Sequence, residues 1–206
     1  MQTLVLGSTS PFRRALLEKL NLPFECAKPN IDETAKQGET PIALVERLAI
    51  EKAKAVVDVT NNEFTDALII GSDQVAVCDG EILGKPHNFE NGFKQLRKFS
   101  GKAVVFYTGL CVYNSKTKQT LSLVEPFTVH FNELNDTDIT HYLHAEQPYN
   151  CAGSFKSEAL GICLFKKLEG EDPNTLIGLP LIKLVALLKQ HGVDVLAEQK
   201  NNASIS

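Results

Sequence analysis

The stretch that decides the fold lies near the start of the chain and reads Leu4-Val5-Leu6-Gly7-Ser8-Thr9-Ser10-Pro11-Phe12-Arg13-Arg14. Its three leading apolar residues predict a short buried strand, and the small residues after them predict a turn. Ser10 is a good N-cap and Pro11 suits the first position of a helix. The stretch therefore predicts a strand, a tight turn and a helix, in that order.

Two arginines, Arg13 and Arg14, fall in the first turn of the predicted helix. The partial positive charge at this end of a helix disfavours cations, and local rules tend to be broken at functional sites. Free helix N–H groups, two hydroxyls and two guanidiniums at one turn favour binding of an anion such as phosphate. The alternative is an ordinary strand, turn and helix with exposed arginines, and this stretch alone does not decide between the two.

The composition of the chain sets limits on its function. The 206 residues suit one domain, or one domain with a lobe, and carry a net charge of −4. Without a basic excess we expect no nucleic-acid partner. We expect no signal peptide and no membrane span, because no charged leader or long apolar run is present. Five widely spaced cysteines without a C-x-x-C pair predict reduced thiols in the cytoplasm and no zinc site.

Carboxylates and lysines stand at several informative positions. Asp32 and Glu33 lie in a predicted loop, where they are either solvated or able to bind a hard cation such as Mg²⁺. A helix should follow Thr40-Pro41 and run to about residue 59. Lys52 falls in the middle of its apolar stripe, so its ammonium group either reaches solvent at the edge or meets an anion.

Asp73 is the strongest functional candidate. It follows the continuous apolar run at 67–71, which predicts a strand buried on both faces. Open α/β sheets place ligands at the carboxyl ends of such strands, although Asp73 could instead cap a local turn. Lys85 stands between Gly84 and Pro86, and this rigid setting suits a lysine that is directed at a ligand. An exposed loop lysine is the alternative.

The remaining pattern completes a mixed α/β fold. We predict helices after the N-caps Asn88 and Asn135, long strands at 103–113 and 120–131, a strand at 160–165, and a final helix from residue 178 to Gly192. These elements favour a twisted central sheet with helices on both faces. The opening turn, Asp73 and Lys85 should share a cleft at the strand ends. We expect a single domain over residues 1–196 and a disordered tail at 197–206.

An ordered series of motifs resembles the Maf nucleotide pyrophosphatases, collinearly from residue 3 to about residue 196. The motifs are Ser8-Thr9-Ser10-Pro11-Phe12-Arg13-Arg14, Glu33 in Asp32-Glu33-Thr34, Glu51-Lys52-Ala53, Gly71-Ser72-Asp73-Gln74, Gly84-Lys85-Pro86, Ser100-Gly101-Lys102 and Gly178-Leu179-Pro180-Leu181. Members that act on dTTP and UTP carry arginine at the position of Phe12, threonine at that of Gln74 and a different segment at 154–158. The chain is more similar to the 7-methyl-GTP pyrophosphatase branch, which often has tryptophan where this chain has Phe12.

The resemblance implies hydrolysis between the α and β phosphates of a nucleoside triphosphate, with a divalent cation, Mg²⁺ or Mn²⁺. It implies Asp73 as the catalytic carboxylate, Glu33 and Asp73 as metal ligands, Ser8, Arg13, Arg14, Lys52 and Lys85 around the phosphates, and Phe12, Gln74 and Glu158 as readers of the base. It also implies cytoplasmic removal of modified nucleotides and, as in some members, a homodimer. The same chemistry on dTTP or UTP is one alternative. A non-catalytic nucleotide-binding protein linked to cell division is the other.

Overall fold

The structure is a computed structural model that describes residues 2–60 and 63–203. It confirms the mixed α/β fold, with a seven-stranded sheet in the order β2 (Glu25–Ala27), β1 (Thr3–Gly7), β3 (Ala67–Cys78), β5 (Ala103–Asn114), β6 (Thr120–Phe131), β7 (Phe165–Glu169), and with β4 (Glu81–Leu83) paired to β3. The pairings of β1 with β2 and β3 are parallel, whereas β4 on β3 and β7 on β6 are antiparallel. The chain divides into two compact units, which are described one at a time.

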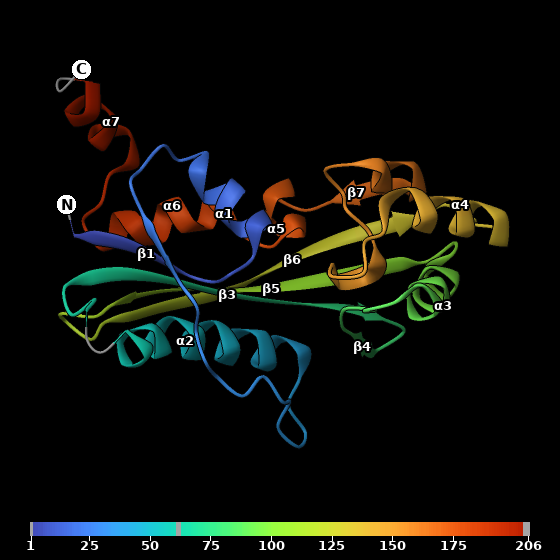
Figure 1. The fold of residues 1–206 in the computed structure, drawn as a ribbon, viewed down its shortest axis with the longest axis horizontal. Coiled ribbons are helices and arrows are strands. Elements are labelled where there is room, and N and C mark those ends of the chain that lie inside the picture. Colours follow the sequence, from blue (N-terminus) through green and yellow to red (C-terminus); the bar gives the residue numbers. More distant parts are fainter. Residues whose placement is uncertain (1, 61–62, 204–206) are drawn as a thin grey trace. The chain divides into compact units, whose positions relative to one another are not determined.

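The first unit comprises residues 1–73, 108–125 and 178–206. Its elements are β1 (Thr3–Gly7), α1 (Pro11–Glu18), β2 (Glu25–Ala27), α2 (Pro41–Val59), α6 (Leu181–Gln190), α7 (Val195–Ala203) and parts of β3 (Ala67–Cys78), β5 (Ala103–Asn114) and β6 (Thr120–Phe131). Figure 1 shows α2 on one face of these strands and α1 and α6 on the other. The predicted N-caps Ser10 and Thr40 both accept a hydrogen bond from the backbone N–H three residues on.

Small residues bring the backbone of α2 very close to the sheet. A Cβ atom added to Gly71 on β3 would lie 2.0 Å from the carbonyl oxygen of Ala49, and one added to Gly109 on β5 would lie 2.1 Å from that of Val45. Asp73 is two residues beyond Gly71 and therefore points to the same face of the sheet as Gly71 does. The close approach at Gly71 thus brings α2 within reach of Asp73.

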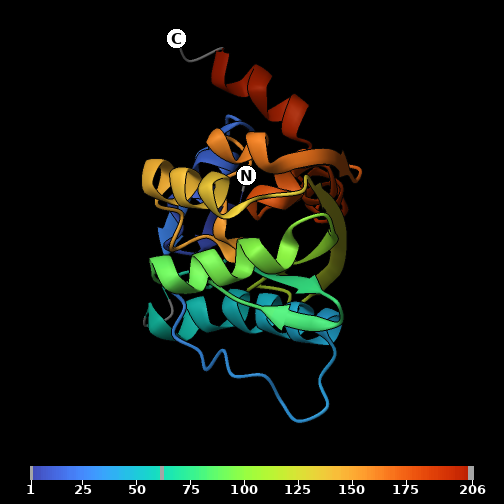
Figure 2. The ribbon, with the colours of Figure 1, turned by 90° about the vertical axis from the view of Figure 1, so that its right-hand side faces the viewer.

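The second unit comprises residues 74–107 and 126–177. It contains the other parts of β3, β5 and β6 together with β4 (Glu81–Leu83), α3 (Phe89–Phe99), α4 (Asp136–Glu146), the 3-10 turns η1 (Ala152–Ser154) and η2 (Leu160–Leu164), β7 (Phe165–Glu169) and α5 (Pro173–Ile177). Helices α3 and α4 lie side by side (Figure 2). Their caps are the predicted ones, because Asn88 caps α3 and Asn135 forms a capping box with Asp138 on α4.

Two assignments near the C-terminal end differ from the sequence prediction. The strand predicted at 160–165 was wrong, since residues 160–164 form a 3-10 turn and the strand is β7, at 165–169. The N–H of Gly161 donates to the carbonyl oxygen of Lys156, and a Cβ there would lie 2.3 Å from that oxygen, so the chain curls where an extended path was expected.

The helix from residue 181 is not the last one, because α7 follows it after Gly192. Asp194 caps α7 by accepting hydrogen bonds from the N–H groups of Leu196 and Ala197. The part of the predicted tail up to residue 203 lies in α7, and residues 204–206 lie outside the described residues. The disordered tail and the single domain over 1–196 stay predictions.

Candidate functional site

The centre of the candidate site is a buried ion pair between α2 and β3. Lys52 Nζ donates to Asp73 Oδ1 over 2.7 Å and lies 3.0 Å from Glu33 Oε1. The Lys52 and Asp73 side chains are only 9% and 11% exposed, whereas that of Glu33 is 61% exposed. The lysine in the apolar stripe therefore meets two anions, and these are the two carboxylates predicted to bind metal.

The β1–α1 turn supplies a second cation to this group. Arg13 is half-buried, and its Nε donates to the carbonyl oxygen of Gly178 over 2.8 Å. Burial lowers the pKa of Arg13 from its ordinary value, while the nearby charges of Asp73 and Glu33 act to raise it. Two cations and two carboxylates thus lie close enough to influence one another.

A second hydrogen bond fixes the same carbonyl group. Ser72 is fully buried, and its Oγ donates to the Gly178 oxygen over 2.9 Å. Gly178 has φ near +122°, which favours glycine, so the turn before α6 is shaped to present this oxygen. Gly178 belongs to one of the motifs in the sequence, but no local signal predicts its role as the acceptor for Arg13.

The other predicted residues of the turn lie as follows. Ser8 is buried, and its Oγ accepts a hydrogen bond from the N–H of Ser10. The Oγ of Ser10 in turn accepts the N–H of Arg13 and so caps α1. Phe12 is half-buried. Arg14 is exposed, and its Nε lies 3.1 Å from Glu18 Oε1 one helical turn along α1. Ser8 therefore supports the turn, and a phosphate contact from Arg14 stays a prediction.

Gln74, Lys85 and Glu158 belong to the second unit. The side-chain nitrogen of Gln74 donates to the carbonyl oxygen of Thr175 over 2.8 Å. Lys85 is exposed, and Glu158 is exposed with Ser157 Oγ at 3.4 Å from its carboxylate. The contribution of these three residues to the site stays a prediction, and so does the shared cleft.

The carboxylates of Glu33 and Asp73 beside Lys52 suit a divalent cation, provided that the substrate supplies its further ligands. Within residues 2–60 and 63–203, no three His, Cys, Asp or Glu side chains gather at one point. Mg²⁺ is commonly held by one or two carboxylates together with substrate phosphates. Glu33 and Asp73 both lie beside Lys52 Nζ, so the site offers two carboxylates, the number that such an ion commonly takes from the protein.

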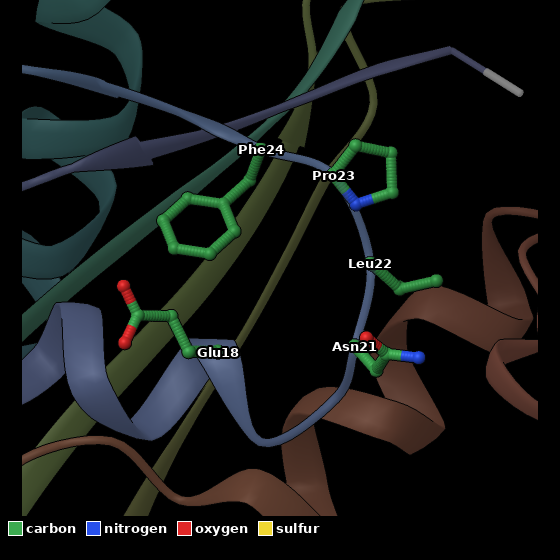
Figure 3. A pocket seen from close by; sticks show the side chains of 5 residues that line it. All are labelled: Glu18, Asn21, Leu22, Pro23 and Phe24. Atoms are coloured by element: carbon green, nitrogen blue, oxygen red, sulfur yellow. The ribbon is translucent and has the colours of Figure 1, made fainter.

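A separate hollow of about 550 Å³ lies beside the end of α1. It is lined by Glu18, Asn21, Leu22, Pro23 and Phe24, and Figure 3 shows Glu18 at the end of the helix and the other four side chains along the segment that follows it. None of the predicted site residues lines it. The hollow therefore adds nothing to the chemistry at Asp73.

Asp73 lies inside β3, three residues beyond the part that pairs with β1, and not at the end of a strand as predicted, because the strand continues to Cys78. Cations and carboxylates beside the carboxyl end of a parallel strand, here β1, are typical of proteins that bind phosphorylated ligands. The family model described as Maf-like protein matches residues 3–191, and the chain therefore belongs to the Maf family. This confirms the resemblance stated from the motifs. Among the described residues, no helix combines the length and apolar character needed to cross a membrane.

Three relatives named 7-methyl-GTP pyrophosphatase match nearly the whole chain. The protein from Colwellia psychrerythraea (strain 34H) is 74% identical over 199 residues, covering 97% of this chain and 98% of that protein. The protein from Pseudoalteromonas translucida (strain TAC 125) is 57% identical, covering 96% of each chain. The protein from Vibrio vulnificus (strain CMCP6) is 56% identical, covering 94% of this chain and 97% of that protein.

Proposed function

We propose that the protein is a nucleoside triphosphate pyrophosphatase that hydrolyses 7-methyl-GTP to 7-methyl-GMP and pyrophosphate. Three relatives that bear this name, at 56–74% identity over nearly their full length, support the substrate. One structural observation supports the reaction: a buried Lys52–Asp73 pair with Glu33 and Arg13 beside it. An anion-binding turn and carboxylates at one point suit hydrolysis of a phosphoanhydride.

In the proposed reaction, water attacks the α-phosphorus, the bond from that phosphorus to the bridging oxygen breaks, and pyrophosphate leaves. Arg13 and Lys52 stabilise the negative charge on the phosphates, because Arg13 is held by Gly178 at the start of α1 and Lys52 is held beside Asp73. Asp73 either accepts the proton from the attacking water or serves mainly as a metal ligand. Mg²⁺ or Mn²⁺, held with the phosphates by Glu33 and Asp73, would neutralise phosphate charge and lower the pKa of a bound water.

A nucleotide panel with pyrophosphate detection, in Mg²⁺ and in Mn²⁺, tests the reaction. We expect Asp73→Asn to lower kcat by at least ~10²-fold, because a carboxylate is lost while the side-chain shape is kept. Asp79→Asn is the matched control, since Asp79 is exposed and pairs with Lys102 on the surface. Activity of Asp73→Asn within twofold of wild type would remove Asp73 from the mechanism. Failure of wild type to turn over any nucleotide would favour a nucleotide-binding interaction protein.

The choice of base is proposed to rest on charge. N7-methylation gives guanine a fixed positive charge, and a cationic ring stacks on an aromatic face with about 0.5–2 kcal/mol. Phe12, half-buried beside the phosphate-binding turn, could supply that face. Glu158 could accept the N–H donors of the guanine pairing edge, with Gln74 adding an amide contact.

The ratio of kcat/KM for 7-methyl-GTP to that for GTP tests this assignment. We expect Phe12→Arg and Glu158→Gln to lower the ratio about tenfold or more, because each loses attraction for the cationic base. Phe12→Trp should keep the ratio, since it retains an aromatic face. Glu90→Gln is the control for Glu158, because Glu90 is an exposed glutamate of the same unit. An unchanged ratio in both test variants would mean that the base is read elsewhere, and turnover confined to dTTP or UTP would give the other substrate class.

The proposal extends to the setting of the enzyme. House-cleaning of modified nucleotides in the cytoplasm fits the five free cysteines, which form no disulfide with one another. A homodimer, as in some relatives of the family, remains part of the proposal.

A further inference from the structure

The loop that carries Glu33 connects β2 to α2 and has no apolar anchor of its own. Residues 32–38 are all exposed, Ile31 is only half-buried, and none of residues 28–40 belongs to a helix or strand. Figures 1 and 2 show this segment looping out beside α2. Hydrophobic packing therefore cannot fix the position of Glu33, so polar contacts must do so.

Arg47 on α2 makes those polar contacts. Its Nε and one terminal nitrogen donate to the two carboxylate oxygens of Glu39 over 2.7 and 2.8 Å, which is a bidentate pair. The terminal nitrogen that donates to Glu39 also donates to the carbonyl oxygen of Thr34 over 3.1 Å. The other terminal nitrogen donates to Glu51 over 3.0 Å. The guanidinium thus joins two points of the loop to the helix.

These two points lie on the C-terminal side of Glu33, and a turn holds the other side. Asp32 Oδ1 accepts the N–H of Thr34 over 2.9 Å and its hydroxyl over 2.6 Å. Arg47 holds the carbonyl group of Thr34, and Thr34 in turn holds Asp32 through these two hydrogen bonds. Glu33 lies between Asp32 and Thr34 in the chain. Glu33 then reaches Lys52 on the same helix over 3.0 Å.

The Arg47–Glu39 pair is well suited to act as a fixed anchor. The two side chains are only 15% and 8% exposed. The guanidinium, with the N–H of Lys36, lowers the pKa of Glu39 to about 2, so the pair is ionised at every pH near neutrality. Burial and two carboxylate partners leave the guanidinium a single arrangement.

We propose that Arg47 is a positioning residue, which holds the 31–39 loop against α2 so that Glu33 faces Lys52 and Asp73. The inference rests on the proposed function, in which Glu33 and Asp73 share a divalent cation with the substrate. Replacement of Arg47 keeps the carboxylate of Glu33 but no longer fixes the position of the loop that carries it. The expected consequence is weaker metal binding with a preserved chemical step.

The test is a metal titration of wild type, Arg47→Lys and Glu39→Gln at saturating nucleotide. Lysine keeps the charge of Arg47 and cannot form the bidentate pair. We expect both variants to need ~10–100-fold more Mg²⁺ for half-maximal rate, the range typical of partners that orient a metal ligand. Their kcat at saturating Mg²⁺ should stay within about threefold of wild type. Arg97→Gln is the matched control, because Arg97 of α3 forms an exposed pair with Asp136 of α4, and it should leave both parameters unchanged.

A second readout does not depend on turnover. Mn²⁺ binding, followed by electron paramagnetic resonance with an α,β-methylene nucleotide analogue present, should weaken by the same factor in both variants. Thermal melts without metal separate this effect from unfolding, because a folded variant with weak Mn²⁺ binding supports positioning. Wild-type Mn²⁺ affinity in a folded Arg47→Lys protein would overturn the inference.

Glu33→Gln separates failure of this inference from failure of the proposed function. If Glu33→Gln weakens Mn²⁺ binding and Arg47→Lys does not, Glu33 keeps its role and Arg47 loses its own. If Glu33→Gln leaves Mn²⁺ binding at the wild-type value, the proposed metal role fails and the positioning role falls with it.

Discussion

Replacement of Lys52 by methionine tests the electrostatics of the site most directly. By sequence alone the exchange would end the cost of burying an ammonium group in an apolar stripe. The structure predicts the opposite, because methionine leaves the buried carboxylate of Asp73 without the partner that lies 2.7 Å away. At that distance and an effective dielectric constant of about 20, the Coulomb attraction is about 6 kcal/mol before desolvation is subtracted.

The net loss of stability should be smaller than this attraction. Breaking a buried ion pair by removing one partner costs about 3–5 kcal/mol. Arg13 still lies near Asp73 and compensates part of its charge, so we expect the lower end, about 3 kcal/mol. For a chain of this length, that loss corresponds to a fall in Tm of roughly 6–12 °C.

A double-mutant cycle in EDTA, measured by thermal and urea unfolding, isolates the pair. Adding Asp73→Asn to Lys52→Met removes the stranded charge and should restore at least about 2 kcal/mol relative to the single variant. Lys54→Met is the control, because Lys54 is exposed on the same helix and lies 5.8 Å from the Tyr113 ring centroid. The reasoning is refuted if Lys52→Met has the Tm of wild type, or if adding Asp73→Asn to Lys52→Met recovers none of the lost stability.

Two further predictions concern packing and thiol reactivity. Gly71→Ala should destabilise the protein by about 3 kcal/mol or more, because its Cβ would lie 2.0 Å from a backbone oxygen of α2, whereas Gly84→Ala, with no atom within 4 Å, should leave Tm unchanged. Equal Tm values for the two variants would contradict the close approach of α2 to β3. Cys26 and Cys163 are exposed and should react rapidly with a disulfide reagent, while burial raises the pKa of Cys111 to about 12 and keeps it slow. More than two fast thiols in the native protein would contradict this burial pattern.

Local signals in the sequence predicted most of the fold. The N-cap followed by proline at Ser10-Pro11 and at Thr40-Pro41 marks two helix starts within a few residues, and both begin there in the structure. The apolar run that ends at Asp73 is equally local. These signals need only neighbouring residues, so a single sequence suffices to find them.

Features that depend on distant residues could not be predicted in the same way. The stripe of α2 left two outcomes for Lys52, solvent at the edge of the stripe or an anion, and the choice between them depends on a strand 21 residues away and on a loop. Arg47 offered only a weak signal, a glutamate four residues on at Glu51, which most exposed helices also show. The run Leu160-Gly161-Ile162 has the composition of a strand, but the N–H of Gly161 donates to Lys156 and that of Ile162 donates to Ala159, so the segment turns instead of extending.

The carbonyl group of Gly178 has a consequence for synthesis of the chain on the ribosome. Arg13 and Ser72 reach this acceptor over sequence separations of 165 and 106 residues, so neither bond can form until the chain has grown past residue 178. A nascent or truncated chain that stops earlier has the turn and both carboxylates but leaves its arginine untethered. Contacts of such long sequence separation also form late in folding. A chain that ends before residue 178 is therefore expected to lack the tether that fixes Arg13, the residue that the proposed hydrolysis uses to hold phosphate.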